Sequence, residues 1–198
     1  MIEFIIGAFL FAKFKKGYKL KYIFKKFPIY LPLIASLFYI YLEYCVFNQQ
    51  YWFFPYQYII KTTTLLSYIP LIYVYNLHRC DEIHNNAFID FIKSPASKAT
   101  FCLWFGSVLN RLALNANNGY MAVFPSNCYW TGYIKPDFVS DGVHILGNAY
   151  TKLIPLCDWI DVGIYCASPG DILARLFVFT IIYYSIKNSN KNSNKMIK

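Results

Sequence analysis

Long apolar runs separated by blocks of lysine are the feature that most restricts how this chain can fold. Leu, Ile, Phe and Tyr follow one another in stretches, and only 15% of the 198 residues are charged, against 57% that are hydrophobic. An ordinary soluble domain is nearer a quarter charged. Apolar runs of this length are typical of helices that cross a bilayer. The sequence therefore predicts an all-α membrane protein.

Five apolar segments are expected to be transmembrane helices of one membrane domain, residues 1–187. The first is short, because its apolar part ends at Phe14 and covers about 20 Å of a hydrocarbon core of about 30 Å. It reaches the required length if the helix continues to Leu20 and its lysines extend toward the headgroups. Pro70 is expected to kink the third span. The predicted spans are residues 2–20, 28–47, 58–77, 99–115 and 169–187.

The positions of Lys and Arg predict the orientation of these spans. Cytoplasmic flanks carry an excess of both residues. Seven lie in residues 13–27, three in 78–98 and four in 187–198, against two in the predicted outer loop, residues 118–168. We therefore expect a bacterial cytoplasmic membrane protein with its N-terminus outside and its C-terminus in the cytoplasm. The basic segment 13–27 is expected to contact anionic lipid.

The net charge of +9 does not by itself indicate nucleic-acid binding. The basic residues form blocks beside apolar segments and do not alternate with aromatic residues on a polar face. The six cysteines form no CxxC pair and no zinc-binding spacing with histidine. His78 and His84 are six residues apart, which puts them on different faces of a helix. No metal, cofactor or nucleic-acid partner is therefore predicted, and an unknown small ligand or membrane partner is expected.

Polar side chains are concentrated near the predicted outer ends of the fourth and fifth spans. Arg and Asn inside an apolar segment need a polar partner or a watery cavity. Arg111 is therefore expected to contact a carboxylate, Asp158 first or Asp171 second, or an array of backbone carbonyls of residues 150–171. Either contact would fold the long loop back as a lid. Arg175 lies four residues after Asp171 and can pair with it. The predicted outward-facing polar pocket comprises Asn110, Arg111, Asn115, Asn117, Asn118, Asp158, Asp171 and Arg175.

A purely structural interpretation of the same residues stays open. Ser168 is suited to cap the last helix, whose dipole favours the Asp171 carboxylate. Asn118 and Gly119 are suited to the turn that ends the fourth helix. The Asn-, Ser- and Lys-rich residues 188–198 predict a disordered basic tail.

Four patches, taken in order, resemble a bacterial family of small integral membrane proteins. Residues 1–20 are similar to its short first helix and Arg-Gly-Gly-like turn, with Tyr18 in place of the second glycine. Asn110 and residues 117–123 resemble its Asn-Gly-Gly-x-Met-Pro-Val end of helix four. Residues 151–160 resemble Thr-Lys-Leu…Leu-Gly-Asp-Trp, and residues 168–171 resemble the Ser-x-Gly-Asp that opens its last helix. The family is domain-of-unknown-function family 5317, and the resemblance implies five helices but no activity.

A second resemblance keeps an enzyme open as the alternative. Lipoprotein signal peptidase has a Gly-Asn-x-x-Asp-Arg helix, then Gly-x-Val-x-Asp, then Asn-x-x-Asp at its last helix. The residues of this chain that resemble that pattern are Gly106, Asn110, Arg111, Gly119, Tyr120 and Asp171. An aspartyl protease needs two carboxylates that share a proton. No acid lies at residues 121–124, so Asp158 would have to supply the first. A membrane-embedded aspartyl hydrolase is thus the alternative to a binding, transport-accessory or structural role.

Overall fold

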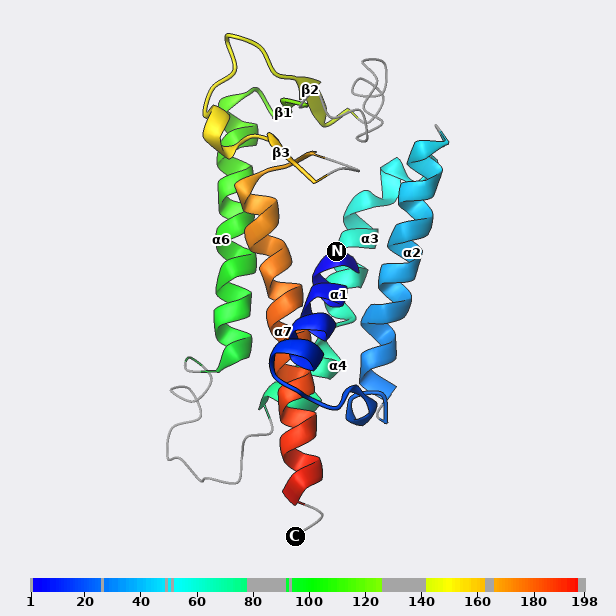
Figure 1. Ribbon diagram of the computed structural model, residues 1–198. Helices are drawn as coiled ribbons and strands as arrows, with labels where there is room; N and C mark the ends of the chain where they lie inside the picture. The colour runs from blue at the N-terminus through cyan, green and yellow to red at the C-terminus, as the bar shows by residue number, and fades with distance from the viewer. Residues whose placement is uncertain are drawn as a thin grey trace. The chain divides into compact units, whose positions relative to one another are not determined.

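The computed structural model is mostly helical (Figure 1) and forms two compact units. Unit 1 contains Met1–Glu43, Pro55–Phe101 and Arg175–Lys198, and unit 2 contains Tyr44–Phe54 and Cys102–Ala174. Helices α6 (Pro95–Ala116) and α7 (Pro169–Lys195) contribute residues to both units. The structure describes residues 2–25, 27–48, 50, 52–77, 92, 94–125, 142–162 and 166–195. That these units form the single membrane domain expected from the sequence stays a prediction.

Unit 1 consists of helices and short helical turns. Its α-helices are α1 (Ile2–Leu10), most of α2 (Tyr30–Phe47), α3 (Gln57–Leu66), α4 (Ile69–Ile72), the start of α6 and most of α7. Wider or tighter turns occupy Phe11–Lys15, Leu20–Tyr22, Phe27–Ile29 and Tyr73–Leu77. The first helical stretch thus ends at Lys15, before the predicted residue 20. The chain turns at Gly17, whose φ of 65° suits a residue without a side chain.

The third predicted span is interrupted at Ser67 and Tyr68, between α3 and α4. The break lies just before Pro70, the residue expected to kink this helix. Proline has no backbone N–H and therefore cannot bond to the carbonyl four residues earlier. Just before the proline the helix tightens: the Ser67 hydroxyl donates to the Thr64 carbonyl at 2.6 Å, and the Tyr68 N–H donates to the Leu65 carbonyl at 3.1 Å.

Helices α1 and α7 run in parallel within unit 1 along one continuous seam. Arg175 donates to Glu3 at 2.8 Å at one end of the seam. The rings of Phe179 and Tyr183 then contact Phe11, with centroids 6.0 and 5.4 Å from it. These three contacts join residues 168–172 positions apart in the same order along both helices, so the start of α1 and the Arg175 end of the seam lie on the same side of unit 1.

The C-terminal part of α7 differs from the sequence-based prediction. Residues 188–195, expected to belong to a disordered tail, continue the helix, and residues 196–198 lie outside the described part of the chain. Asn188 donates to the Tyr75 carbonyl at 2.6 Å, and Asn190 bonds to the backbone of Lys19. Tertiary hydrogen bonds therefore order a segment whose composition alone suggests disorder.

One helix in the described part of the chain, Pro169–Lys191, is long and apolar enough to cross a membrane. A shorter apolar helix covers Phe27–Leu42. The helical class predicted from the sequence is confirmed in this coarser form. The predicted set of five spans goes further than this finding and stays a proposal.

Unit 2 gives structure to much of the predicted outer loop. Strand β1 (Met121–Val123) pairs in parallel with β2 (His144–Leu146), and β3 (Ile160–Asp161) pairs antiparallel with β4 (Cys166–Ala167) (Figure 1). A tight helical turn covers Ile154–Leu156, and Val123 forms a bridge with Asp158. The buried residues of this cap, a name used here for residues 117–125, 142–162 and 166–168, include Met121, Ala122 and Cys157, which pack on Ala113 of α6.

Candidate functional site

Asn110, Ser168 and Asp171 form a closed ring of hydrogen bonds in unit 2. Ser168 Oγ donates to Asn110 Oδ1 at 2.8 Å, and Asn110 Nδ2 donates to Asp171 Oδ1 at 2.7 Å. The Asp171 N–H donates back to Ser168 Oγ at 3.0 Å, and the Ser168 N–H donates to Asp171 Oδ2 at 3.4 Å. The bond to Ser168 Oγ is the helix N-cap predicted for the start of α7, and the bond to Asp171 Oδ2 makes this N-cap reciprocal. Asn110 connects this helix N-cap to α6. The three residues Asn110, Ser168 and Asp171 are called the polar junction below.

Two glycines bring the backbones of α6 and α7 together beside the polar junction. A Cβ on Gly106 would overlap the Gly170 carbonyl and would lie 2.9 Å from the Ala174 nitrogen. A Cβ on Gly170 would overlap the Asn110 amide. Small residues of this kind allow close helix contact, as in membrane helix packing. The glycines therefore hold Asn110 within reach of Ser168 and Asp171.

Asn117 fastens the cap to the end of α6. Its Oδ1 accepts from the Lys152 N–H at 2.8 Å, and its Nδ2 donates to the Lys152 carbonyl at 2.9 Å. The same Nδ2 donates to the Ala113 carbonyl at 2.9 Å, one turn earlier on α6. The helix then ends through two residues with positive φ, Asn118 at 59° and Gly119 at 88°, as predicted for this turn.

Asp158 lies inside the cap and links its strands. Its N–H donates to the Ala122 carbonyl at 3.0 Å, and its carbonyl accepts from the Phe124 N–H at 2.8 Å. Its side chain is 6% exposed and lies 3.5 Å from His144 Nε2. Burial raises the pKa of the neighbouring Cys157 thiol, and the negative charge of Asp158 raises it further. Cys157 is therefore a neutral, buried packing residue near pH 7.

Three of the four family-like patches meet in this unit. Asn110 reaches residues 168–171, and Asn117 reaches Lys152. The strand that follows Asn117 pairs with Asp158. The profile of the family of unknown function DUF5317 matches residues 20–183, most of the chain. The chain belongs to this family. No curated protein and no solved structure matches it.

The eight pocket residues predicted for this DUF5317 protein do not converge on one point. Asn110 and Asp171 are bonded to each other, whereas Asn117 holds Lys152 and Asp158 lies beside His144. Arg175 belongs to the α1–α7 seam of unit 1, where it pairs with Glu3 and not with the expected Asp171. The remaining three, Arg111, Asn115 and Asn118, are exposed.

The predicted contact of Arg111 with a carboxylate is corrected by the structure. Within the described part of the DUF5317 chain, Arg111 is exposed and no ion pair involves it. Successive residues of an α-helix point about 100° apart, so Asn110 and Arg111 face different directions. Asn110 therefore fills the linking role assigned to Arg111. The sequence signal for this role is a Ser-x-x-Asp helix N-cap at the start of α7 together with an asparagine inside the preceding helix α6.

The two carboxylates that the aspartyl hydrolase alternative requires have different partners in the structure. The Asp171 carboxylate bonds to Asn110 and Ser168, and the Asp158 carboxylate lies beside His144. A hydrolase of this type needs both carboxylates to face one water molecule. Among the described residues, no three His, Cys, Asp or Glu side chains are grouped so that they could hold a metal ion. His78 and His84 lie outside those residues.

Proposed function

We propose that this chain is a multi-pass protein of the bacterial cytoplasmic membrane with a binding, transport-accessory or structural role on the outer side. In this proposal the polar junction is the base of an outward-facing polar site. The cap, held by Asn117 and Asp158, forms the adjoining surface. The N-terminus lies outside and the C-terminus lies in the cytoplasm.

The polar junction carries this proposal. Asn110, Ser168 and Asp171 join two segments some 60 residues apart through side-chain bonds of 2.7 and 2.8 Å. Polar groups in apolar surroundings are stabilised when each is bonded, and a fully bonded set fixes one geometry. These side chains are engaged in holding backbone in place, which suits a scaffold or binding surface better than a proton-transfer site.

The exposed residues of the cap support a binding role. Tyr150 is 92% exposed, and Trp159 is 48% exposed although its indole N–H donates to the Pro155 carbonyl at 3.1 Å. Amphipathic rings of this kind are enriched at membrane–water interfaces and at binding surfaces. A cap with a bonded interior and exposed rings therefore suits contact with a membrane surface or a ligand.

The proposed topology is supported by two independent features. The excess of Lys and Arg falls on the segments assigned to the cytoplasm. The parallel course of α1 and α7 in unit 1 requires Glu3 and Arg175 to be on the same side. The proposed five spans meet that requirement, because with an odd number of spans the first and the last cross the membrane in the same direction.

Labelling of intact cells with a membrane-impermeant maleimide tests the proposed topology. Tyr150→Cys should increase labelling over the parent chain, which carries native cysteines. Lys21→Cys should increase labelling only after the cells are opened. Labelling of Lys21→Cys in intact cells, or protection of Tyr150→Cys there, would overturn the proposed orientation. Cys80 and Cys128, which the sequence also places on opposite sides, lie outside the described residues.

A further inference from the structure

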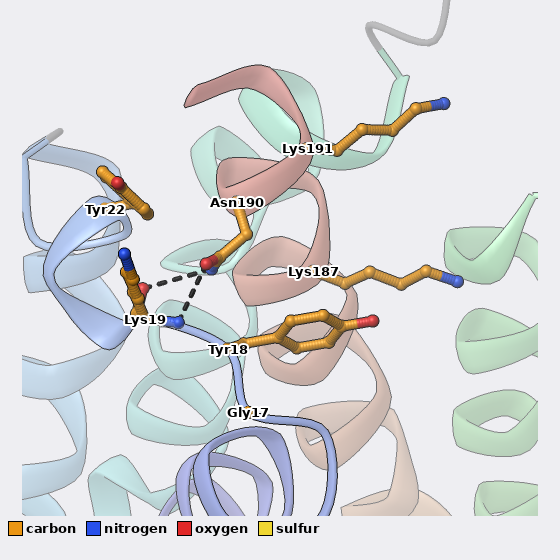
Figure 2. A pocket seen from close by; sticks show the side chains of 7 residues that line it. All are labelled: Gly17, Tyr18, Lys19, Tyr22, Lys187, Asn190 and Lys191. Atoms are coloured by element: carbon orange, nitrogen blue, oxygen red, sulfur yellow. Dashed lines mark hydrogen bonds between the residues drawn. The ribbon is translucent and has the colours of Figure 1, made fainter. Parts of the chain in front are cut away.

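A cavity of about 470 Å³ lies in unit 1 where the turn after α1 meets the C-terminal part of α7. Its lining includes Tyr18, Lys19, Tyr22, Lys187, Asn190 and Lys191. Figure 2 shows Lys187 and Lys191 extending in the same direction as the ring of Tyr18, with Lys19 and Tyr22 across Asn190. The volume is within the range of small-ligand pockets, about 300–1,000 Å³.

The backbone around this cavity is fixed by Asn190. Its Oδ1 accepts from the Lys19 N–H at 2.8 Å, and its Nδ2 donates to the Lys19 carbonyl at 3.1 Å (Figure 2). A third bond joins Nδ2 to the Ile186 carbonyl at 2.9 Å. The ring of Tyr18 also contacts Tyr183, with centroids 6.3 Å apart. The lining residues from the two ends of the chain are therefore held in a defined relation.

The two segments that line the cavity carry an excess of positive charge. Residues 4–42 and 172–198 contain no Asp or Glu, although they carry most of the lysines of the chain. Aromatic rings contact some of these ammonium groups, such as Lys187 over Tyr184 at 5.3 Å and Lys25 over Tyr22 at 5.5 Å. A ring face attracts a cation but does not neutralise it. The described lining of the cavity holds three lysines and no acidic residue, so it favours an anion.

From these observations we infer that the cavity binds a phosphate group through Lys187 and Lys191, with the Tyr18 hydroxyl as a further donor. Ammonium and phenolic groups are the donors that a phosphate oxygen accepts from. The phosphate can belong to the headgroup of an anionic phospholipid or to a soluble phosphate compound. The lipid source rests on the proposed membrane location, whereas the soluble source does not. This assigns a defined site, built from both ends of the chain, to the basic segment 13–27.

Isothermal titration of the full chain in phosphatidylcholine nanodiscs tests this site, with short-chain phosphatidylglycerol and inorganic pyrophosphate as separate probes. The test variant is Lys187→Gln/Lys191→Gln. Its control is Lys13→Gln/Lys15→Gln, which removes the same charge from exposed residues outside the cavity lining. A basic residue near a phosphate surface contributes about fivefold in affinity, so the test variant should bind about 30-fold more weakly. The control should change affinity less than about twofold.

Substitutions that keep the positive charge distinguish a loss of binding from a loss of folding. Lys187→Arg/Lys191→Arg should keep the parent affinity, and all variants should keep the parent helical circular dichroism. Equal weakening by the test and control pairs, or binding of neither probe by the parent, would overturn the site. Binding of phosphatidylglycerol alone identifies a lipid headgroup as the ligand. Binding of pyrophosphate alone identifies a soluble phosphate, and that result would stand even if the maleimide labelling refuted the membrane topology.

Discussion

Asn117 in unit 2 and Asn190 in unit 1 hold a distant lysine backbone in the same way. Each Oδ1 accepts from the lysine N–H at 2.8 Å, and each Nδ2 donates to the lysine carbonyl, at 2.9 and 3.1 Å. Each Nδ2 also donates to the carbonyl four residues earlier in its own helix, at 2.9 Å in both cases. One side-chain arrangement therefore fastens both Lys152 and Lys19 to a helix.

The two asparagine sites differ in the length of chain they close and in their exposure. Asn117 closes 35 residues and Asn190 closes 171. Loop closure depends only weakly on length, so the longer loop adds about 1.4 kcal/mol of entropic cost. Asn190 is only 8% exposed, whereas Asn117 is half-buried, so water can replace the bonds of Asn117 more easily. The Asn117 site lies within the residues matched to the family, and both partners of the Asn190 site lie outside them.

The units also differ in how closely their helices approach, and this difference gives the largest expected effect. Gly106→Ala should lower the free energy of unfolding by about 3 kcal/mol, because its Cβ would overlap backbone that cannot move aside. Gly7→Ala is the matched control, since its Cβ would lie 3.9 Å from the Phe179 ring, an ordinary contact. It should be neutral or stabilise by up to about 1 kcal/mol. Thermal unfolding in micelles measures both, and equal stability of the two variants would contradict this contrast.

Removal of the Asn110 amide gives the next largest effect. Asn110→Ala removes the bonds to Ser168 and Asp171 and should cost about 2–3 kcal/mol, because one of them involves a carboxylate. Asn115→Ala, at an exposed position of the same helix, should change stability by less than about 0.5 kcal/mol. Chemical denaturation of the two variants measures the difference. A cost at Asn115 that matches the cost at Asn110 would show that the junction has no special role.

The two asparagine sites themselves should differ moderately. Asn190→Ala should cost about 2 kcal/mol and Asn117→Ala about 1 kcal/mol, since water reaches the partly buried bonds of Asn190 less easily than the exposed bonds of Asn117. Limited proteolysis gives a local readout. Asn190→Ala should raise cleavage near residues 17–22, and Asn117→Ala should raise it near residues 148–153. Cleavage at the same sites in both variants would indicate general unfolding. It would contradict the view that Asn190 and Asn117 stabilise two separate parts of the chain.

The Glu3–Arg175 pair at the end of the α1–α7 seam should have the smallest effect. The Glu3 side chain is 40% exposed and that of Arg175 is 19% exposed, so solvent screens their attraction. Glu3→Gln should cost less than about 1 kcal/mol. The reversed pair, Glu3→Arg with Arg175→Glu, should recover most of this loss in thermal unfolding. A loss above about 2 kcal/mol in Glu3→Gln would show that the pair is desolvated in its working environment.

Local signals in the sequence predicted the helix ends of unit 2 correctly. Ser168 caps the start of α7 through the Asp171 N–H, as expected, and Asn118 and Gly119 form the expected turn. Both features depend only on residues a few positions apart. The observed bounds of α6, Pro95–Ala116, contain the predicted span 99–115. The family resemblance is also confirmed.

Partners far apart in the chain could not be predicted in the same way. Arg175 bonds to Glu3 and Asn190 to Lys19, across more than 170 residues. The side of α6 that faces its neighbours could not be fixed either, because an apolar helix with few polar residues shows no clear amphipathic face. For this reason the sequence predicts the linking role for Arg111, whereas Asn110 performs it. The composition around Asn188 and Asn190 predicts a polar tail because composition carries no information about their distant partners.

The separation of Lys19 from Asn190 also sets an order of events during synthesis. At about 5–20 residues per second, the 35 residues from Asn117 to Lys152 take about 2–7 s, and the 171 from Lys19 to Asn190 take about 9–34 s. The cap can therefore be fastened while the ribosome is still making α7. Helix α1, although made first, waits longest for the residues it packs against, so the newborn chain depends on its surroundings to protect that helix until translation nears its end.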